Sequence, residues 1–320
     1  MSDEAMLLRS LPASRRAGIA SRAFAAVRDE NPLYSSLSHR YYQSYAGGSC
    51  DPVDVVVLRK GEPVLFLPLS GDGKRLSYFG EPARLFPVPP GTDPGPAAFG
   101  ALLATLVALQ ELGYAELLLI EDPRVSLRVI ERERLEVGIV DLEADDAGLR
   151  RGLRKSYKSL VNWGQRNLAM ALIDAADPDA IGFRAMRDFH RKVAGRLTRS
   201  DETWEIQLEM IRAGEAFAVL GNYQGRLVAA NLVIHGSRSA YYGVGVYDRE
   251  LMAQGLPLAH GLLFRTMLET RARGMHSLLL GDVTRHGDAK LDGIATFKRG
   301  FASRVAGETR VLASVERRTQ

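Results

Sequence analysis

The feature that most constrains the fold is an order of elements that occurs twice along the chain. Each half contains two apolar runs around a turn, one more apolar run, an apolar helical segment closed by glycine, and a last apolar run. The first hairpin begins near Asp54 and the last strand of that half near Ala115, 61 positions later. The matching points in the second half, Ala216 and His276, are 60 positions apart. Order and spacing therefore predict two copies of one unit, although the halves share almost no identical residues.

The periodicity of apolar residues predicts the elements of each copy. In the first half we expect a hairpin over 53–70, a strand over 73–81, a helix over 97–113 and a strand over 114–121. In the second half we expect a hairpin over 216–236, a strand over 239–248, a helix over 256–274 and a strand over 275–283. This order gives a mixed, mainly antiparallel sheet flanked by helices, and not a doubly wound parallel one. The predicted fold class is α/β in the α+β sense, with domains over 1–148 and 149–320.

The second copy opens with a basic segment. Residues 149–167 contain six basic residues and no acidic one, namely Arg150, Arg151, Arg154, Lys155, Lys158 and Arg166. Apolar side chains recur there at helical spacing, at Leu149, Leu153, Tyr157 and Val161, which predicts one amphipathic helix with a basic outer face. The next helix, over 178–195, is predicted to be capped by Asp177 ahead of Pro178.

Charge is divided unevenly between the two halves. Residues 1–148 carry 15 Lys and Arg against 21 Asp and Glu, whereas residues 149–320 carry 27 against 17. The second half is therefore expected to attract anions, such as the phosphates of nucleotides, coenzyme A or RNA. A basic surface that serves only solubility is the alternative.

Several classes of protein are not indicated. No apolar run reaches the roughly 18–20 residues that a membrane span needs, and the N-terminal segment has no apolar signal-peptide core. The one cysteine, Cys50, cannot form an internal disulfide, so we expect a cytoplasmic protein. Metal-ligand spacings such as HxxxH and CxxC are missing, as are the Walker, GxGxxG and GxSxG motifs. The sequence therefore predicts no bound metal and no hydrolase triad, and it defines no oligomeric state.

Several motifs, taken in their order, resemble those of FemABX-like proteins, which are two-domain members of the GNAT acyltransferase superfamily. In the second half they are "LRKSYKSLVNWGQR", "GVGVYD", "PLAHGLLFRTMLETRARGMHSLLLGDV" and "GDAK…FKRGF"; in the first they are "NPLYSS" and "VVVLRKGEPVLFLPL". The resemblance covers most of the chain, most strongly 149–301 and weakly 1–50. It implies two tandem GNAT-like domains, the second carrying the active site. It also implies transfer of an acyl or aminoacyl group to an amine.

The resemblance places Phe297 and Lys298 beside the reacting ester. Attack of an amine on an ester or thioester forms a tetrahedral oxyanion, which a fixed ammonium such as that of Lys298 would stabilise. Phe297 would hold the stem of the lysine and stack on a terminal adenine. The alternative is that "FKRGF" is a last β-strand, with Phe inside and Lys outside.

Other candidate residues follow from position and from the resemblance. Asp282 ends an apolar strand, where it could accept a proton from the incoming amine or orient it, or could be a turn aspartate. Arg196 and Arg199 lie in a loop where family members contact substrate phosphates, and Tyr242 matches a tyrosine that lines the substrate channel. Strand alternation predicts that Tyr242 faces away from Tyr241 and Tyr247. The further substrate-binding candidates are Arg154, Tyr157 and Lys290.

The predicted donor is aminoacyl-tRNA, and no other cofactor is expected. The usual GNAT pyrophosphate loop, R/Q-x-x-G-x-G/A, is missing ahead of the helix that follows Gln254 and Gly255. The predicted acceptor is the amine of an anionic, nucleotide-linked sugar or peptide. One alternative is an acetyl-CoA-dependent N-acyltransferase acting on an amino sugar or similar amine, since a helix N-terminus still binds phosphates. A second is a ligand- or RNA-binding module on the same fold that performs no catalysis.

Overall fold

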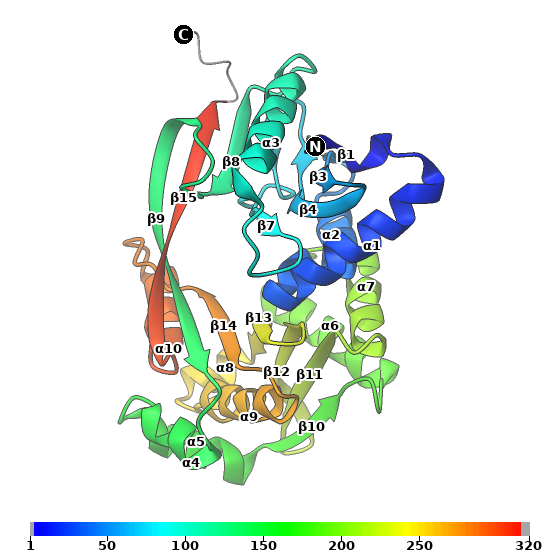
Figure 1. The fold of residues 1–320 in the computed structure, drawn as a ribbon. Helices are drawn as coiled ribbons and strands as arrows, with labels where there is room; N and C mark the ends of the chain where they lie inside the picture. Colours follow the sequence, from blue (N-terminus) through cyan, green and yellow to red (C-terminus); the bar gives the residue numbers. More distant parts are fainter. Residues whose placement is uncertain (1–2, 315–320) are drawn as a thin grey trace. The chain divides into compact units, whose positions relative to one another are not determined.

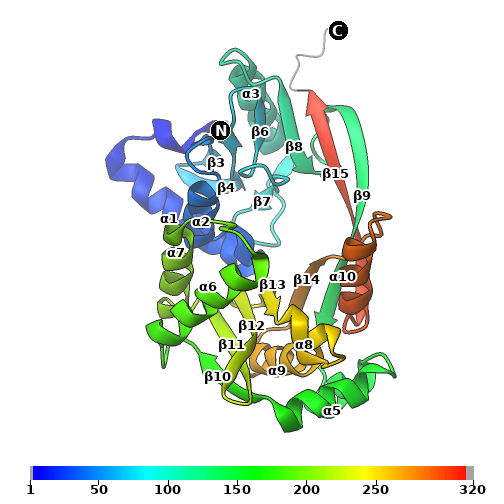
Figure 2. The same ribbon diagram turned by 180° about the vertical axis from the view of Figure 1, so that it is seen from behind.

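The computed structural model describes residues 3–314, which form two compact units (Figures 1 and 2). The first unit contains the residues up to Glu30, Tyr34–Leu135, and the residues from Gly307 onward. The second unit contains Asn31–Leu33 and Glu136–Ala306. Each unit contains one hairpin, one further strand, one long helix and one strand after that helix.

The border between the units differs from the predicted domain boundary at 148/149. The chain leaves the first unit between Leu135 and Glu136, inside strand β9 (Arg128–Asp141), and returns to it inside strand β15 (Arg304–Ser314). The reason is that two long strands each give residues to both units. An apolar pattern read along the sequence does not indicate where such a strand changes partners.

The first unit consists of helices and two groups of strands. Its helices are α1 (Ala13–Glu30), α2 (Ser36–Tyr45) and α3 (Gly95–Gln110), with 3-10 turns at Leu8–Ser10 and Pro32–Tyr34. One group is a four-stranded sheet in the order β1 (Glu4–Leu7), β3 (Val55–Arg59), β4 (Glu62–Leu67) and β7 (Phe86–Pro87). The other runs β2 (Asp51–Pro52), β5 (Ser70–Gly71), β6 (Arg75–Ser77), β8 (Glu116–Ile120) and then the end of β15.

The predicted hairpin of the first unit is confirmed. Strands β3 and β4 pair antiparallel, and Lys60 and Gly61 between them have φ of 53° and 83°. Positive φ at both central residues is what a tight two-residue hairpin turn requires. The four residues Val55–Leu58 are all buried, because helices α1 and α3 pack against this sheet. Their uninterrupted apolar run is typical of a strand covered on both faces.

The second unit is built on a sheet in the order β10 (Ala169–Ile173), β11 (Ala216–Tyr223), β12 (Arg226–His235), β13 (Ser239–Tyr247), β14 (Ser277–Asp282) and the end of β9. Its helices are α4 (Asp146–Gly152), α5 (Tyr157–Asn167), α6 (Ala180–Ala194), α7 (Asp201–Arg212), α8 (Arg249–Ala253), α9 (Leu258–Ala272) and α10 (Ala289–Arg299). Neighbouring strands from β10 to β13 pair antiparallel, and so do β14 and β9. Strands β13 and β14 pair parallel.

The parallel pair explains the position of α9. Parallel neighbours cannot be joined by a tight turn, so α8 and α9 form the crossover between β13 and β14. Nine of the fifteen residues of α9 are buried, and the helix packs against β11, β12, β13 and β14. On its other side α9 crosses α5, where a Cβ added to Gly164 would lie 2.6 Å from the Cα of Gly261. Glycine at both positions therefore permits contact between the two helix backbones.

Two local predictions in the second half are wrong. The segment 149–167 forms two helices, α4 and α5, and not one, because Leu153 is extended and the backbone N–H of Arg154 donates to the Gly300 carbonyl at 3.0 Å. Helix α6 is capped by Asp179, whose carboxylate accepts from the N–H groups of Ile181 and Gly182, and not by Asp177.

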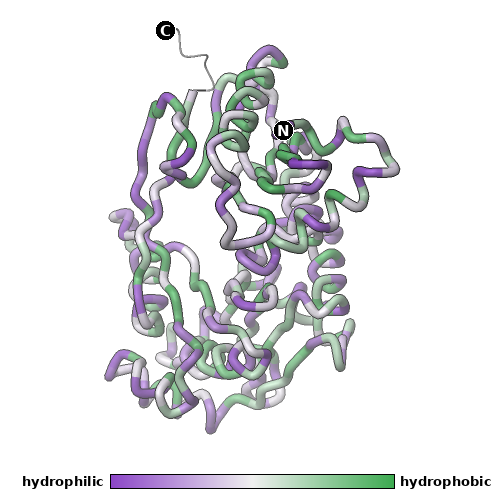
Figure 3. Tube along the Cα trace, viewed as in Figure 1, coloured by the Kyte–Doolittle hydropathy of each residue, from purple (hydrophilic) through white to green (hydrophobic). Residues whose placement is uncertain are grey.

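The long strand β9 was not assigned from the sequence. Charged residues dominate its first half, "RVIERERLE", which Figure 3 colours largely as hydrophilic. Most of these side chains are exposed or half-buried, so the apolar pattern that identifies a strand is weak there. Only Ile139 and Val140, near the end of β9, belong to the buried core.

Three features of residues 3–314 concern membranes, metals and thiols. No described helix combines the length and the apolar character needed to cross a bilayer. Within the same residues, no three His, Cys, Asp or Glu side chains gather in a way that could hold a metal ion. The thiol of Cys50 is buried in the first unit.

Candidate functional site

The candidate site begins where the parallel strands β13 and β14 part. They pair from Ser239 and Ser277 to Tyr241 and Leu279, and within the described residues no pairing continues beyond that point. Strand β13 runs on to Tyr247, and β14 turns at Gly281, whose φ of +78° favours glycine. The point at which the strands part is called the fork below. Parting strands leave room in a sheet for side chains or a ligand.

Lys298 reaches the fork from helix α10. Its Nζ donates to the backbone carbonyl of Asp282 at 3.3 Å. A Cβ added to Gly281 would lie 3.5 Å from Lys298 Nζ and 3.1 Å from Tyr241 Oη, so the ammonium and the phenol converge on this glycine. Burial lowers the pKa of Lys298, and the nearby Asp282 opposes that shift. The segment "FKRGF" is thus a helix end, and the alternative of a last β-strand is wrong.

The carboxylate of Asp282 is held by two partners on its own loop. Its Oδ1 accepts from the Thr284 N–H at 2.7 Å, and its Oδ2 lies 2.9 Å from His286 Nε2. Burial alone would raise the pKa of Asp282, but the hydrogen bonds from Thr284 and His286 outweigh it and hold the pKa below the usual range. Asp282 is therefore ionised at neutral pH and is suited to orienting His286 more than to accepting a proton itself.

An aromatic cluster supports the end of α10. Four rings make it up, those of Tyr157, His260, Phe297 and Phe301, with centroids 4.5 Å apart for Tyr157 and His260 and 5.2 Å apart for His260 and Phe297. Tyr157 Oη also donates to the Thr296 carbonyl at 3.3 Å. Phe297 is thus part of the packing that fixes α10, which positions the neighbouring Lys298.

His260 is the unexpected member of this cluster. Burial lowers its pKa to about 4, so the ring is neutral at pH 7. Its Nδ1 is buried, and no group within residues 3–314 gives it a hydrogen bond of normal geometry. The pattern "PLAHGLL" reads as an apolar helix start, so nothing in the sequence marks this histidine as part of a site.

Tyr242 does not face the fork. Its Oη lies 2.7 Å from Tyr247 Oη, and both hydroxyls donate to Asn231 Oδ1, at 3.2 and 2.8 Å. The prediction that Tyr242 and Tyr247 lie on opposite faces is wrong, because a β-bulge at Gly243 inserts one residue and reverses the alternation. Burial raises the pKa of Tyr242 to about 12. Tyr241 is the tyrosine beside Lys298, and it was missed because the resemblance indicated its neighbour Tyr242.

The remaining predicted residues lie at separate places. Arg196 is exposed just after α6, and the Arg199 guanidinium stacks on Trp204, 3.6 Å from the ring centre. Lys290 is exposed in the first turn of α10, eight residues before Lys298 and therefore about 12 Å from it along the helix axis. Arg154 is exposed beside Tyr157.

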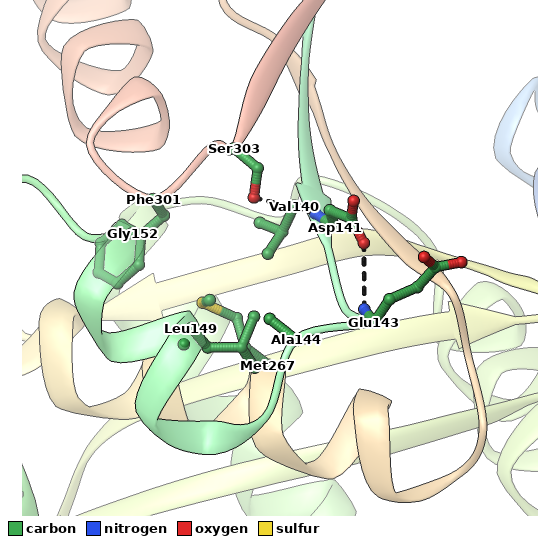
Figure 4. A pocket seen from close by; sticks show the side chains of 10 residues that line it. Val140, Asp141, Glu143, Ala144, Leu149, Gly152, Met267, Phe301 and Ser303 are labelled. Atoms are coloured by element: carbon green, nitrogen blue, oxygen red, sulfur yellow. Dashed lines mark hydrogen bonds between the residues drawn. The ribbon is translucent and has the colours of Figure 1, made fainter.

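Two cavities flank the C-terminal end of α10. One, of about 330 Å³, is lined by Gly152, Arg154, Arg285, Thr296, Arg299 and Gly300. The other, of about 240 Å³, has Leu149, Met267 and Phe301 among its apolar lining and the acidic side chains of Asp141 and Glu143 beside them (Figure 4). The first cavity is cationic, whereas the second is apolar and acidic.

Three solved structures share this fold. The crystal structure of FemX matches with a TM-score of 0.66 and 11% identity, over 97% of each chain. A tandem GNAT protein from the clavulanic acid biosynthesis pathway matches with a TM-score of 0.55 and 14% identity, over 99% of each chain. L-PGS from Bacillus licheniformis matches with a TM-score of 0.53 and 14% identity, over 91% of each chain.

These comparisons confirm the predicted fold class. The chain has the FemABX-like tandem GNAT fold, with mixed and mainly antiparallel sheets flanked by helices. No protein-family model matches the sequence, and no curated protein does. At identities of 11–14% the likeness shows the fold alone, so function has to be argued from the site.

Proposed function

We propose that this protein is an acyltransferase that moves an aminoacyl group from aminoacyl-tRNA to the amine of an anionic, nucleotide-linked sugar or peptide. The observation that carries the proposal is the convergence of Lys298 Nζ and Tyr241 Oη on Gly281 at the fork. Two hydrogen-bond donors fixed at one point, one of them cationic, suit the oxyanion that forms during acyl transfer.

The proposed reaction uses the groups around Asp282. The nitrogen lone pair of the acceptor bonds to the ester carbonyl carbon, and Lys298 and Tyr241 donate to the resulting oxyanion. The oxyanion then collapses and breaks the carbon–oxygen bond to the terminal ribose. The nitrogen gives up one proton to His286, and His286 passes it to the ribose oxygen. Asp282 accepts the Nε2 proton of His286, which leaves the proton-accepting lone pair on Nδ1.

Two observations support aminoacyl-tRNA as the donor. The second unit carries most of the chain's excess of basic residues, and the glycine-rich pyrophosphate loop of acetyl-CoA-dependent GNAT proteins is missing ahead of α9. FemX, the solved structure with the highest TM-score of the three, matches over almost the whole chain.

Acetyl-CoA remains the second candidate donor, and one observation favours it. Helix α9 begins after Pro257 without a side-chain cap, and a helix N-terminus can donate backbone N–H groups to an anion. The tandem GNAT structure that matches over 99% of each chain is described as being without AcCoA, so AcCoA is named as a compound of interest for that protein.

The test is a donor-discharge assay on the full chain. The protein is mixed with charged tRNA bearing labelled amino acids, or with labelled acetyl-CoA, together with nucleotide-sugar and amino-sugar acceptors. Transfer from tRNA that is lost in Lys298→Ala supports the proposal. Transfer from acetyl-CoA alone overturns the choice of donor. If tRNA binds without any transfer and Lys298→Ala changes nothing, the protein is a binding module.

A further inference from the structure

The cationic cavity beside α10 has no role in the reaction described above. Three of its six lining residues are arginines, Arg154, Arg285 and Arg299. Arg299 is engaged, because its Nε donates to the Val283 carbonyl at 3.1 Å and its Nη2 pairs with Glu136. Arg154 and Arg285 form no ion pair with a carboxylate anywhere in residues 3–314. The cavity therefore presents about two uncompensated positive charges.

A surplus of guanidinium groups around one cavity favours an anionic ligand. The fork-shaped guanidinium suits the oxygens of a phosphate, to which it can donate two parallel hydrogen bonds. Thr296 and the backbones of Gly152 and Gly300 complete the lining, so no carboxylate faces the cavity directly. At about 330 Å³ it matches the lower end of ligand-binding pockets, which suits a phosphate with an adjoining sugar and not a long polymer.

The cavity and the reacting centre are built on the same helix end. Lys298 and Arg299 are consecutive, and they donate to the consecutive carbonyls of Asp282 and Val283. Arg285 follows two residues later on the same loop. Lys298 and three residues that line the cavity, Thr296, Arg299 and Gly300, therefore lie at the same end of α10.

We propose that this cavity binds the phosphodiester on the 5′ side of the terminal, ester-bearing nucleotide of the donor RNA. The inference rests on the proposed function, whose donor it specifies. In an aminoacylated RNA only one ribose separates the ester from that phosphodiester. In an acyl-CoA the whole pantetheine arm separates the thioester from the pyrophosphate. Lys298 precedes the cavity-lining Arg299 directly in the sequence, which fits the shorter separation in the RNA.

The direct test measures binding of a labelled, uncharged trinucleotide CCA to the full chain by fluorescence anisotropy. Arg285→Ala and Arg154→Ala should each weaken binding about tenfold, the usual effect of losing one charge-assisted hydrogen bond. Each should also make the salt dependence shallower by about 0.7 in the log–log slope. Arg226→Ala is the matched control, since Arg226 is an exposed arginine of the same unit, and it should leave affinity and slope unchanged.

A second measurement separates this proposal from the proposed function. With charged tRNA as donor, Arg285→Ala should raise KM about tenfold and leave kcat within a factor of two, since the phosphodiester contact is made in both the ground and the transition state. Lys298→Ala should lower kcat instead. A thermal melt shows whether Arg285→Ala folds as the unmodified protein does, which is expected because its side chain is exposed.

Each outcome bears on one of the two claims. If charged tRNA is a donor and neither arginine variant changes RNA affinity or KM, the cavity proposal is overturned and the proposed function stands. If the arginine variants lose RNA affinity while no donor supports transfer, the cavity proposal stands and the proposed function fails. If the variants lose affinity for coenzyme A and keep affinity for CCA, the ligand is a coenzyme and the RNA assignment is overturned.

Discussion

Among residues 3–314, β13 and β14 of the second unit and β6 and β8 of the first unit pair parallel, and the two pairs end differently. In the second unit, β13 and β14 pair over three residues and then part. In the first unit, β6 and β8 pair in parallel over two residues, from Arg75 and Glu116. The residues that follow β6 return to β8, because the Ala83 N–H donates to the Leu118 carbonyl at 2.9 Å and the Ala83 carbonyl accepts from the Ile120 N–H at 2.8 Å. Backbone thus fills the fork of the first unit.

Side chains occupy the same place in the second unit. Lys298 and Tyr241 converge on Gly281, where the first unit has backbone hydrogen bonds. Strand β14 ends in Asp282, whose carboxylate is hydrogen-bonded to His286 and whose backbone carbonyl accepts from Lys298, whereas Asp122, two residues beyond the end of β8, pairs with Arg124 of its own loop. In one unit backbone hydrogen bonds therefore close the fork, whereas in the other the side chains of Lys298 and Tyr241 enter it.

Lys298→Ala tests this contrast most strongly. Loss of an oxyanion donor should lower kcat by about 10²–10³-fold, equivalent to about 3 kcal/mol. Stability should not fall, because the ammonium is held in a partly buried place that lowers its pKa. Donor-discharge kinetics and a urea melt measure the two effects. Arg124→Ala, which alters the loop of the closed fork, should leave kcat unchanged; an equal loss there would contradict the assignment of the reactive fork to the second unit.

Ala83→Pro tests the closed fork. Proline removes the N–H that donates to the Leu118 carbonyl, and the loss of this hydrogen bond should cost about 1–3 kcal/mol of unfolding free energy. Ala83→Gly keeps the N–H and should cost less than about 1 kcal/mol. Urea titration of both variants gives the difference. A kcat that drops in the folded Ala83→Pro protein as it does in Lys298→Ala would mean that the first fork takes part in the reaction.

Gly281→Ala and Gly274→Ala form a matched pair. Both glycines have positive φ, of +78° and +79°, so both variants should lose about 1–2 kcal/mol of stability. At Gly274 the new methyl group meets nothing within 4 Å, whereas at Gly281 it crowds Tyr241 and Lys298. Only Gly281→Ala should therefore lower kcat/KM, by about tenfold, because a misplacement of about 1 Å can cost up to about 10²-fold. Equal activity in the two variants would argue against a reaction at the fork.

Tyr241→Phe and Tyr242→Phe separate the two neighbouring tyrosines. Tyr241→Phe removes a donor at the fork and should lower kcat several-fold. Tyr242→Phe breaks the buried contacts with Tyr247 and Asn231 and should lower the free energy of unfolding by about 1 kcal/mol, with kcat unchanged. A lower kcat in Tyr242→Phe, with kcat unchanged in Tyr241→Phe, would support the prediction that Tyr242 lines the substrate channel.

The smallest effect expected is a pH dependence. Because the pKa of Lys298 is lowered from 10.5, kcat should fall as the pH rises through the lowered value. In Lys298→Arg this fall of the pH–rate profile should move to higher pH, because arginine stays protonated. Stability should change in the opposite direction. Between the two pKa values the unfolded chain binds more protons than the folded chain, so the contribution of Lys298 to the free energy of unfolding rises with pH. If kcat falls at the same pH in Lys298→Arg as in the unmodified protein, the titrating group is not Lys298.

Much of the fold could be predicted, because it depends on local patterns. The two hairpins, the crossover helix α9 and the strands β8 and β14 follow from apolar periodicity and glycine stops. The break between α4 and α5 could not, because it depends on the contact between Arg154 and Gly300, far apart in the sequence. Strand β9 was not predicted because charged residues lie on both faces of its exposed first half, so the alternation of apolar and polar residues that identifies a strand is weak there.

The candidate site was predicted in part. The sequence and the resemblance indicated Lys298 and Asp282, and the structure brings these two residues together, while their roles stay predictions. Tyr241 was missed because the resemblance indicated its neighbour Tyr242, and His286 was missed because its contact with Asp282 depends on the turn after β14. The arginine cavity joins residues from the turn between α4 and α5, the loop after β14 and the end of α10, which no sequence window contains.

The return of β15 to the first unit has a consequence for synthesis of the chain. Strand β8 pairs with residues near the C-terminus, Ile120 with Arg310 and Glu116 with Ser314. A ribosome adding about 5–20 residues per second emits the partner strand roughly 10–40 s after β8. During that interval the edge of β8 presents unpaired N–H and C=O groups that can join other chains. A strand made early is thus completed by residues made much later, so nascent chains that stall before Arg310 are expected to need protection from aggregation.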